Sequence, residues 1–309
     1  AKNLYEKLTN EFVRDECKFI NADYNDRKFL FTVASDKQIP GCYDKEDNVQ
    51  WVFSILQIPS YINFPIGHPQ PNTLYMGHPL KPGVYIPFEN ATEQLFMEKV
   101  RELCYLAQCL GAVEIRFKRI KGREVTTADT SSKRGAFELA RKFVEVGVGT
   151  ELTDLKTETQ TSNNGVELVQ RYSPIKKPFC PEGMVWYDSD PTWQTLVKQR
   201  LNGNILSYVE HVSSSETTTV SSSQLMSLKA SLGFLVAKAS GSYDSKTDKT
   251  FSKTEETEWE IDMQFKPLQD FDDANASNGQ AVAQIAQTQN SELSEDELAY
   301  KEEVEFCLE

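Results

Sequence analysis

The sequence lacks any apolar run of 18 or more residues, the length from which a membrane-spanning helix is expected. It begins Ala1-Lys2-Asn3 without a following apolar stretch, so we expect no secretory signal at this position. None of its six cysteines forms a C-x-x-C pair, and a chain of 309 residues is long enough to fold without disulfides. We therefore expect reduced cysteines in a cytoplasmic protein.

The chain is also poor in the residues and motifs that enzymes use. It has only three histidines, and two of them, His68 and His78, lie in Gly-His-Pro turns. The nucleophile motif G-x-S-x-G and the phosphate-binding motifs G-x-x-x-x-G-K-[ST] and G-x-G-x-x-G are absent. Cys104 and Cys109 do not share a face of the helix predicted around them. We assign no catalytic residue, cofactor or metal ligand.

Carboxylates are abundant enough to leave an enzyme of unknown class open. The most site-like pair is Asp188 and Asp190, which lie beside Trp186, Tyr187 and Trp193. Asp190 directly precedes a proline at the first position of a predicted helix, which is typical of an N-cap. We therefore interpret this cluster as a helix cap next to aromatic core residues.

The negative charge is concentrated at the C-terminal end. The whole chain has a formal net charge of −13, and residues 255–309 hold 16 acidic residues against two lysines. The remainder of the chain is therefore close to neutral, and the acidity of the tail says little about the partners of the main body.

A basic patch lies upstream of this tail. Between Glu114 and Lys142 nine Lys and Arg residues stand against four acidic ones, and those selected as contact residues are Arg116, Lys118, Arg119, Lys121 and Arg123. Such a surface attracts nucleic acid, but no nucleic-acid-binding motif accompanies it and the net negative charge disfavours a polyanion.

We predict instead that the basic patch contacts the acidic tail, in the same chain or in a neighbouring copy. The tail residues of this predicted contact are Glu302, Glu303 and Glu305. The alternative is that both are solvated surfaces without a mutual contact.

Hydrophobic spacing predicts a mixed α+β fold. A helix over 92–110 would be capped by Asn90 or Thr92, and Gly111 stands where a left-handed C-terminal cap is needed. Further predicted elements are strands over 28–33, 50–56 and 112–118, a strand pair over 151–161 and 166–172, and a helix from Asp190 to Gly203.

The segment over 205–265 is the most unusual part of the chain. Residues 206–223 are rich in Ser, Thr and Val and predict a long strand, and 224–239 have helical spacing. Strict alternation over 257–265 predicts a half-buried antiparallel strand, with Trp259, Ile261, Met263 and Phe265 on its apolar face.

These elements predict an N-terminal α/β portion over 1–125, a β-rich portion with long antiparallel strands over 126–268, and an acidic tail with a terminal helix over 269–309. The expected function is that of a non-catalytic intracellular interaction or assembly protein, which uses its long strands and charged tail to bind itself or another protein.

One alternative is a membrane-active, pore-forming effector that the acidic tail holds inactive. Pore-forming proteins use amphipathic strand pairs, but the polar face of the strand over 257–265 is strongly anionic, so a membrane is not the favoured partner. An enzyme of unknown class comes third.

Overall fold

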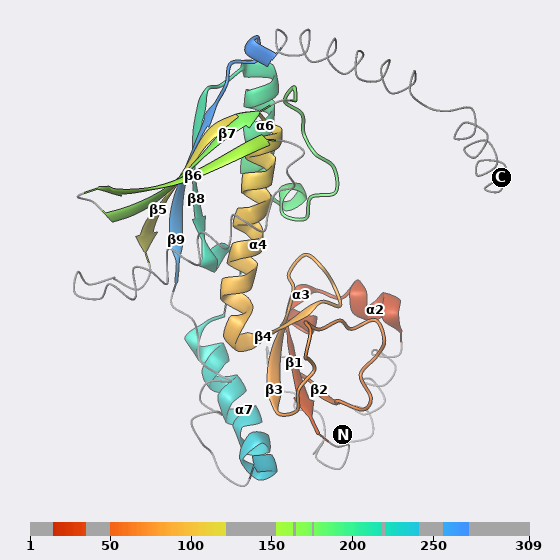
Figure 1. Cartoon of the computed structure of the whole chain (residues 1–309). Helices are drawn as coiled ribbons and strands as arrows, with labels where there is room; N and C mark the ends of the chain where they lie inside the picture. Colours follow the sequence, from red (N-terminus) through yellow and green to blue (C-terminus); the bar gives the residue numbers. More distant parts are fainter. Residues whose placement is uncertain are drawn as a thin grey trace, which may run out of the picture.

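The computed structural model describes residues 15–34, 50–121, 153–162, 165–174, 176–217, 220–240 and 256–271. These residues form two antiparallel-rich sheets with helices, which agrees with the predicted mixed α+β class. The long helix α4 (Phe88–Cys109) runs from one sheet to the other (Figure 1). The predicted acidic tail and its helix lie outside the described residues.

The first sheet has four strands in the order β2-β1-β3-β4. Its strands are β1 (Phe29–Val33), β2 (Gln50–Ser54), β3 (Thr73–Gly77) and β4 (Tyr85–Pro87), preceded by the short helices α2 (Glu16–Ile20) and α3 (Tyr24–Arg27). The strands β1 and β2 are parallel and the other two pairs are antiparallel. One face of the sheet joins the main core, and the other carries a second cluster that includes Phe19, Trp51, Tyr75 and Tyr85.

Helix α4 begins four residues earlier than predicted. Its N-cap is Pro87, which makes no side-chain capping bond, so neither Asn90 nor Thr92 caps it. Burial of Phe88 and Ala91 fixes the first turn through packing instead. The predicted end is confirmed, because Gly111 follows the helix with a φ of 82°.

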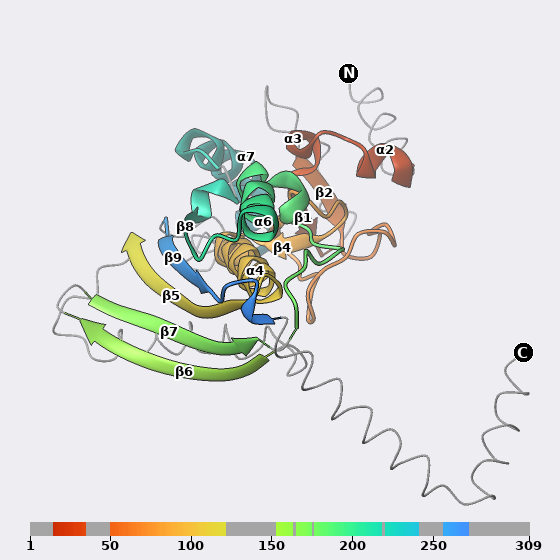
Figure 2. The ribbon, with the colours of Figure 1, turned by 90° about the horizontal axis from the view of Figure 1, so that it is seen from above.

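The second sheet has five strands in the order β6-β7-β5-β9-β8, and every neighbouring pair is antiparallel. Its strands are β5 (Ala112–Lys121), β6 (Thr153–Ser162), β7 (Gly165–Pro174), β8 (Ser207–Ser213) and β9 (Glu258–Phe265). The sheet curves around α4 (Figure 2). The predicted strand pair β6–β7 and the alternation of β9 are both confirmed.

The strand predicted over 206–223 is shorter than expected. β8 ends at Ser213, where the 3-10 turn η3 (Ser214–Glu216) begins, and helix α7 (Ser222–Ser240) follows. The chain thus leaves the sheet after seven strand residues and returns to it as β9 beside β8.

Helix α6 (Pro191–Gly203) packs beside α4 and is capped by Asp190, as predicted. Its fully buried Arg200 donates hydrogen bonds to the carbonyl oxygens of Leu110 at 2.9 Å, Ile205 at 3.2 Å and Lys266 at 2.5 Å. Burial lowers the pKa of this guanidinium to about 10. Through these hydrogen bonds Arg200 connects the ends of α4, α6 and β9.

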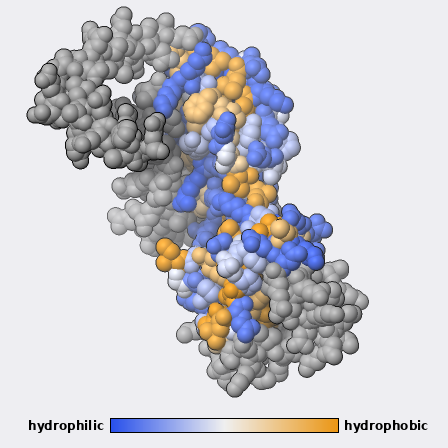
Figure 3. Space-filling view, turned by 90° about the vertical axis from the view of Figure 1, so that its right-hand side faces the viewer, coloured by the Kyte–Doolittle hydropathy of each residue, from blue (hydrophilic) through white to orange (hydrophobic). Residues whose placement is uncertain are grey.

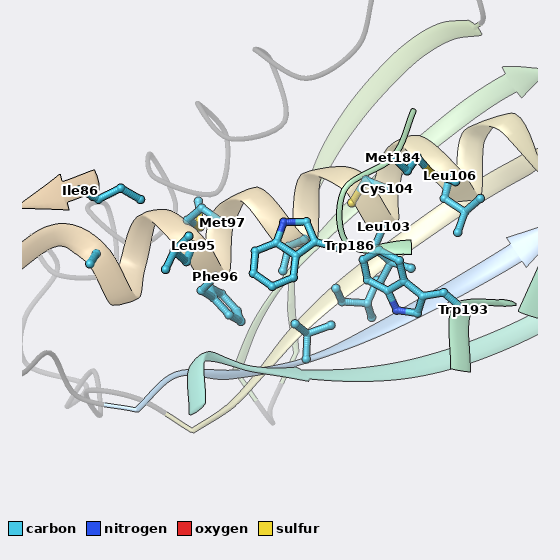
Figure 4. Close-up of a cluster of buried hydrophobic side chains, with 14 of the residues drawn as sticks. Ile86, Leu95, Phe96, Met97, Leu103, Cys104, Leu106, Met184, Trp186 and Trp193 are labelled. Carbon is cyan, nitrogen blue, oxygen red and sulfur yellow. The ribbon is translucent and has the colours of Figure 1, made fainter. Parts of the chain in front are cut away.

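A single hydrophobic cluster includes residues from both sheets and from α4. Figure 4 shows part of it, with Leu95, Phe96 and Leu103 on α4 and with Trp186 and Trp193 against the helix. β5 precedes residue 125 and nevertheless lies at the centre of a sheet whose other strands follow it, so the cluster continues across the predicted boundary. Among the described residues, no helix is long and apolar enough to cross a membrane.

Candidate functional site

His78 is buried and both of its ring nitrogens have partners. Nδ1 accepts the backbone N–H groups of Leu80 and Lys81, each at 3.0 Å, and Nε2 lies 3.1 Å from Oε1 of Glu98. Burial alone would raise the pKa of Glu98, but hydrogen bonds from His78 and Lys81 outweigh it and lower the pKa to about 2. The imidazole therefore fixes a turn, with both ring nitrogens engaged in structural contacts.

Cys104 and Cys109 are buried thiols, and the other two histidines lie on different strands or turns of the fold. Burial raises the pKa of the Cys104 thiol to about 12 and also raises that of Cys109, so both remain protonated at neutral pH. His68 Nδ1 lies 2.7 Å from the Tyr75 hydroxyl, and His211 is exposed on β8. Among the described residues, no group of three or more His, Cys, Asp or Glu side chains could hold a metal ion.

A buried lysine on α4 holds three elements together. Lys99 Nζ lies 3.2 Å from Oδ2 of Asp190 and 3.4 Å from Oε2 of Glu216. It also lies 5.5 Å from the ring centre of Trp193 and 5.9 Å from that of Trp186, which Figure 4 shows against α4. The lysine thereby joins α4 to the start of α6 and to η3, the turn that follows β8.

The sequence singled out part of this cluster and missed the rest. Asp190 and the two tryptophans were recognised by their proximity in the chain, whereas Lys99 and Glu216 are far from them in sequence. Only the packing of α4 against α6 and η3 brings these side chains together.

A further carboxylate on β8, Glu210, faces the same cluster. Burial raises its pKa, the negative charges of Asp190 and Glu216 raise it further, and Tyr208 and Lys99 partly offset them. One lysine therefore faces three carboxylates, and the Glu210 carboxyl is the one whose ionisation the fold opposes.

The predicted basic patch lies partly on the central strand of the curved sheet. Arg116 and Lys118 of β5 are directly opposite Asp262 and Glu260 of β9, and Arg116 Nε lies 2.5 Å from Oε1 of Glu114. Acidic residues of the neighbouring strand thus already accompany these cations.

The other predicted contact residues are only partly placed. Arg119 and Lys121 belong to β5, where they are opposite Trp259 and Glu258. Arg123, Glu302, Glu303 and Glu305 lie outside the described residues. The contact between the patch and the tail stays a prediction.

β8 is the terminal strand at one side of the five-stranded sheet, and it presents an open edge. Val209 is 49 % exposed, as is Leu206 just before the strand. The carbonyl oxygen of Leu206 accepts a hydrogen bond from the N–H of Phe265 on β9. The backbone groups of successive strand residues point in alternate directions, so the N–H and C=O groups of Ser207, Val209 and His211 point away from β9. No further strand pairs with these groups in the part of the chain that the structure describes.

β6 is the terminal strand at the other side of the sheet (Figure 2). Its sequence includes three charged residues at alternate positions, Asp154, Lys156 and Glu158. Charged residues are a common protection of an edge strand against pairing with another chain. β8 lacks both lysine and proline, its one carboxylate, Glu210, faces the Lys99 cluster, and Val209 is exposed on it, so it is the less protected edge.

Other large exposed hydrophobic side chains do not belong to a sheet edge. Leu56 and Ile66 lie in turns, and Met226 lies on α7. On the face shown in Figure 3, hydrophilic residues divide the exposed hydrophobic surface into separate patches. This pattern gives no continuous apolar groove on that face.

No protein-family model matches the chain, and no curated protein or solved structure shows significant similarity to it.

Proposed function

We propose that the protein is a non-catalytic interaction or assembly protein that binds a protein partner by strand addition at β8. The observation that carries the proposal is an edge strand with exposed Val209 and with backbone groups directed away from its neighbour. A partner strand along β8 would satisfy these backbone groups and cover the Val209 side chain.

The chemistry of the described side chains supports binding more than catalysis. His78 uses both ring nitrogens in structural contacts, and Cys104 is a buried thiol of raised pKa. The charged cluster at Lys99 connects helices and a turn, as a structural tie does. These residues lack the free base or activated nucleophile that an acid–base or covalent mechanism needs.

A lysine at the exposed edge position tests the proposal. Val209→Lys should weaken self-association by at least about tenfold, because strand addition would bring a charge into the new ladder. The measurement is the weight-average mass of the full chain as a function of protein concentration, by light scattering and sedimentation equilibrium.

Met226→Lys is the matched control, since Met226 is 73 % exposed but lies on α7. We expect this variant to associate like the wild type. Equal association of Val209→Lys and an associating wild type would contradict the proposal.

A second function, that of a membrane-active effector, is favoured by the connection between β8 and β9. Neighbouring antiparallel strands need only a two-residue turn, yet residues 214–257, including α7, separate these two. If this segment extended both strands, each would be longer than the roughly 9–11 residues that cross a bilayer.

Dye release from anionic liposomes tests this second function. The full chain is compared with a chain cut after Asp273, which retains Phe271, a buried residue that closely approaches Gly111. Release by the shortened chain alone would support an effector that the tail holds inactive. Absence of release by both chains would contradict it.

A further inference from the structure

We infer that the partner of β8 is the β8 strand of a second copy of this chain, related by a two-fold axis that passes through Val209. This inference rests on the proposed function and adds the identity of the partner, the symmetry and the register. The resulting sheet would have β8 and its copy at the centre and the two β6 strands at its outer edges.

Two copies could be joined through β8 and β6 or through β8 and β8, and the number of strands in the sheet decides between these two arrangements. Five strands alternate in direction, so the terminal strands β6 and β8 run the same way. Head-to-tail joining of β8 to β6 of a second copy would therefore give a parallel pair. Two-fold joining of β8 to β8 gives an antiparallel pair, which is the more common and slightly more stable arrangement.

The difference in charged residues between the two edge strands also favours pairing through β8 over pairing through β6. A pairing that involved β6 would place Asp154, Lys156 and Glu158 in the new ladder. A pairing of β8 with its copy brings together strands whose exposed positions are Ser207, Val209 and His211, with the apolar Val209 in the middle. A two-fold contact through β8 leaves no free β8 edge in either copy, so the assembly is a closed dimer.

The side chains of β8 then select the register. Residues opposite each other must belong to the same face, so the axis passes through a single residue. An axis at Glu210 would place two carboxylates opposite each other, and an axis at Tyr208 would place each Glu210 opposite Leu206. With an axis at His211, the position opposite Ser207 would lie beyond the end of the partner strand, in η3.

An axis at Val209 avoids all three problems. It pairs the two exposed Val209 side chains, and it places Tyr208 opposite Glu210 of the second copy, where a hydroxyl meets a carboxyl. It also places Ser207 opposite His211 of the second copy. The outward backbone groups of Val209 then meet their own counterparts, as an antiparallel hydrogen-bonded pair requires.

Disulfide trapping tests the axis directly. Val209→Cys, in a full chain whose Cys17, Cys42 and Cys307 are replaced by Ser, should form a covalent dimer under mild oxidation. Two residues on the axis are about 5.5 Å apart at their Cα atoms, which suits a disulfide.

Leu206→Cys in the same background is the matched control, because Leu206 is as exposed as Val209 at 49 %. Three residues from the axis, its two copies would be about 20 Å apart and could not be bridged. We therefore expect no covalent dimer from Leu206→Cys beyond the level of the background protein.

A mixing experiment checks the register in a second way. Ser207→Cys and His211→Cys should each give little dimer alone, whereas their mixture should give a mixed disulfide dimer. If Val209→Cys and Leu206→Cys trap equally, or if the mixture traps no more than its parts, the two-fold register is wrong.

The failure of this inference differs from the failure of the proposed function. If Val209→Lys abolishes association but Val209→Cys gives no covalent dimer, strand addition at β8 holds and the two-fold partner does not. A growing series of oligomers instead of a dimer would indicate head-to-tail joining to β6. If Val209→Lys leaves association intact, both proposals fail.

Discussion

At the scale of single residues, Glu210 and Glu98 experience opposite electrostatic environments beside the same helix. Burial and two neighbouring carboxylates raise the pKa of Glu210. Burial opposes ionisation of Glu98 too, but hydrogen bonds from His78 and Lys81 lower the pKa of that carboxyl to about 2. The two groups should therefore affect stability in opposite directions as the pH changes.

We predict that Glu210→Gln stabilises the protein at pH 7. The folded state binds the Glu210 proton more tightly than the unfolded state does, so stability is lost as the pH rises from the unfolded pKa through the folded pKa. Gln removes this loss. Urea unfolding between pH 4 and pH 8 should show a gain that grows with pH and vanishes near pH 4.

Glu98→Gln is the counterpart with the opposite sign. Its carboxylate contributes stability above the unfolded pKa, and that stability is lost as the pH falls toward 2. Because its side chain is 34 % exposed, we expect a loss of only about 1–2 kcal/mol at pH 7. If both variants shifted stability in the same direction at pH 7, the electrostatic account would be incorrect.

Local sequence rules predicted single residues well where the cause is local. Asp190 caps α6 and Gly111 ends α4, because capping depends on a few neighbouring backbone groups. Lys99 gave no such signal, because its partners Asp190 and Glu216 come from α6 and η3, far along the chain.

At the scale of elements, the junction of α4 and β5 depends on a glycine for two separate reasons. Gly111 has a φ of 82°, and a Cβ at this position would lie 2.6 Å from Cζ of Phe271 and 2.9 Å from Cγ of Pro178. Gly183 shares only the first reason, with a φ of 73° and no atom within 4 Å.

We predict that Gly183→Ala costs about 1 kcal/mol of unfolding free energy, from backbone conformation alone. Gly111→Ala should cost about 1–3 kcal/mol more, because Phe271 and Pro178 must also move. Chemical denaturation of both variants measures the difference. Equal losses would mean that the chain after β9 adjusts freely around Gly111.

Elements with strong periodicity were predicted correctly, and an element controlled by side-chain hydrogen bonds was not. The alternation of β9 follows from one buried and one polar face. β8 was expected to be longer because residues 206–223 are rich in Ser, Thr and Val, of which Thr and Val favour strands. Ser213 instead accepts the N–H of Ser215, and Ser214 accepts the N–H of Thr257, so these hydroxyls end the strand and start η3.

At the scale of the whole molecule, the net charge of −13 opposes self-association. Strand addition at β8 depends on backbone hydrogen bonds and apolar contact, so screening should strengthen it. We predict a several-fold tighter dimer when salt is raised from about 50 to 300 mM. Light scattering at matched protein concentrations measures this change.

The predicted contact between basic patch and acidic tail gives the opposite salt dependence when it joins two copies. Salt would then dissociate the assembly by screening the attraction between patch and tail. An oligomer that dissolves with salt would therefore favour the tail contact and contradict assembly through β8.

The position of β5 at the centre of its sheet has a consequence for synthesis of the chain. Ile115 pairs with Gln170 on one side and with Met263 on the other. The ribosome must add roughly 150 further residues before β9 exists, which takes on the order of ten seconds. During that interval one side of β5 has no permanent strand neighbour, so this side of the nascent sheet stays open to other strands until β9 is made.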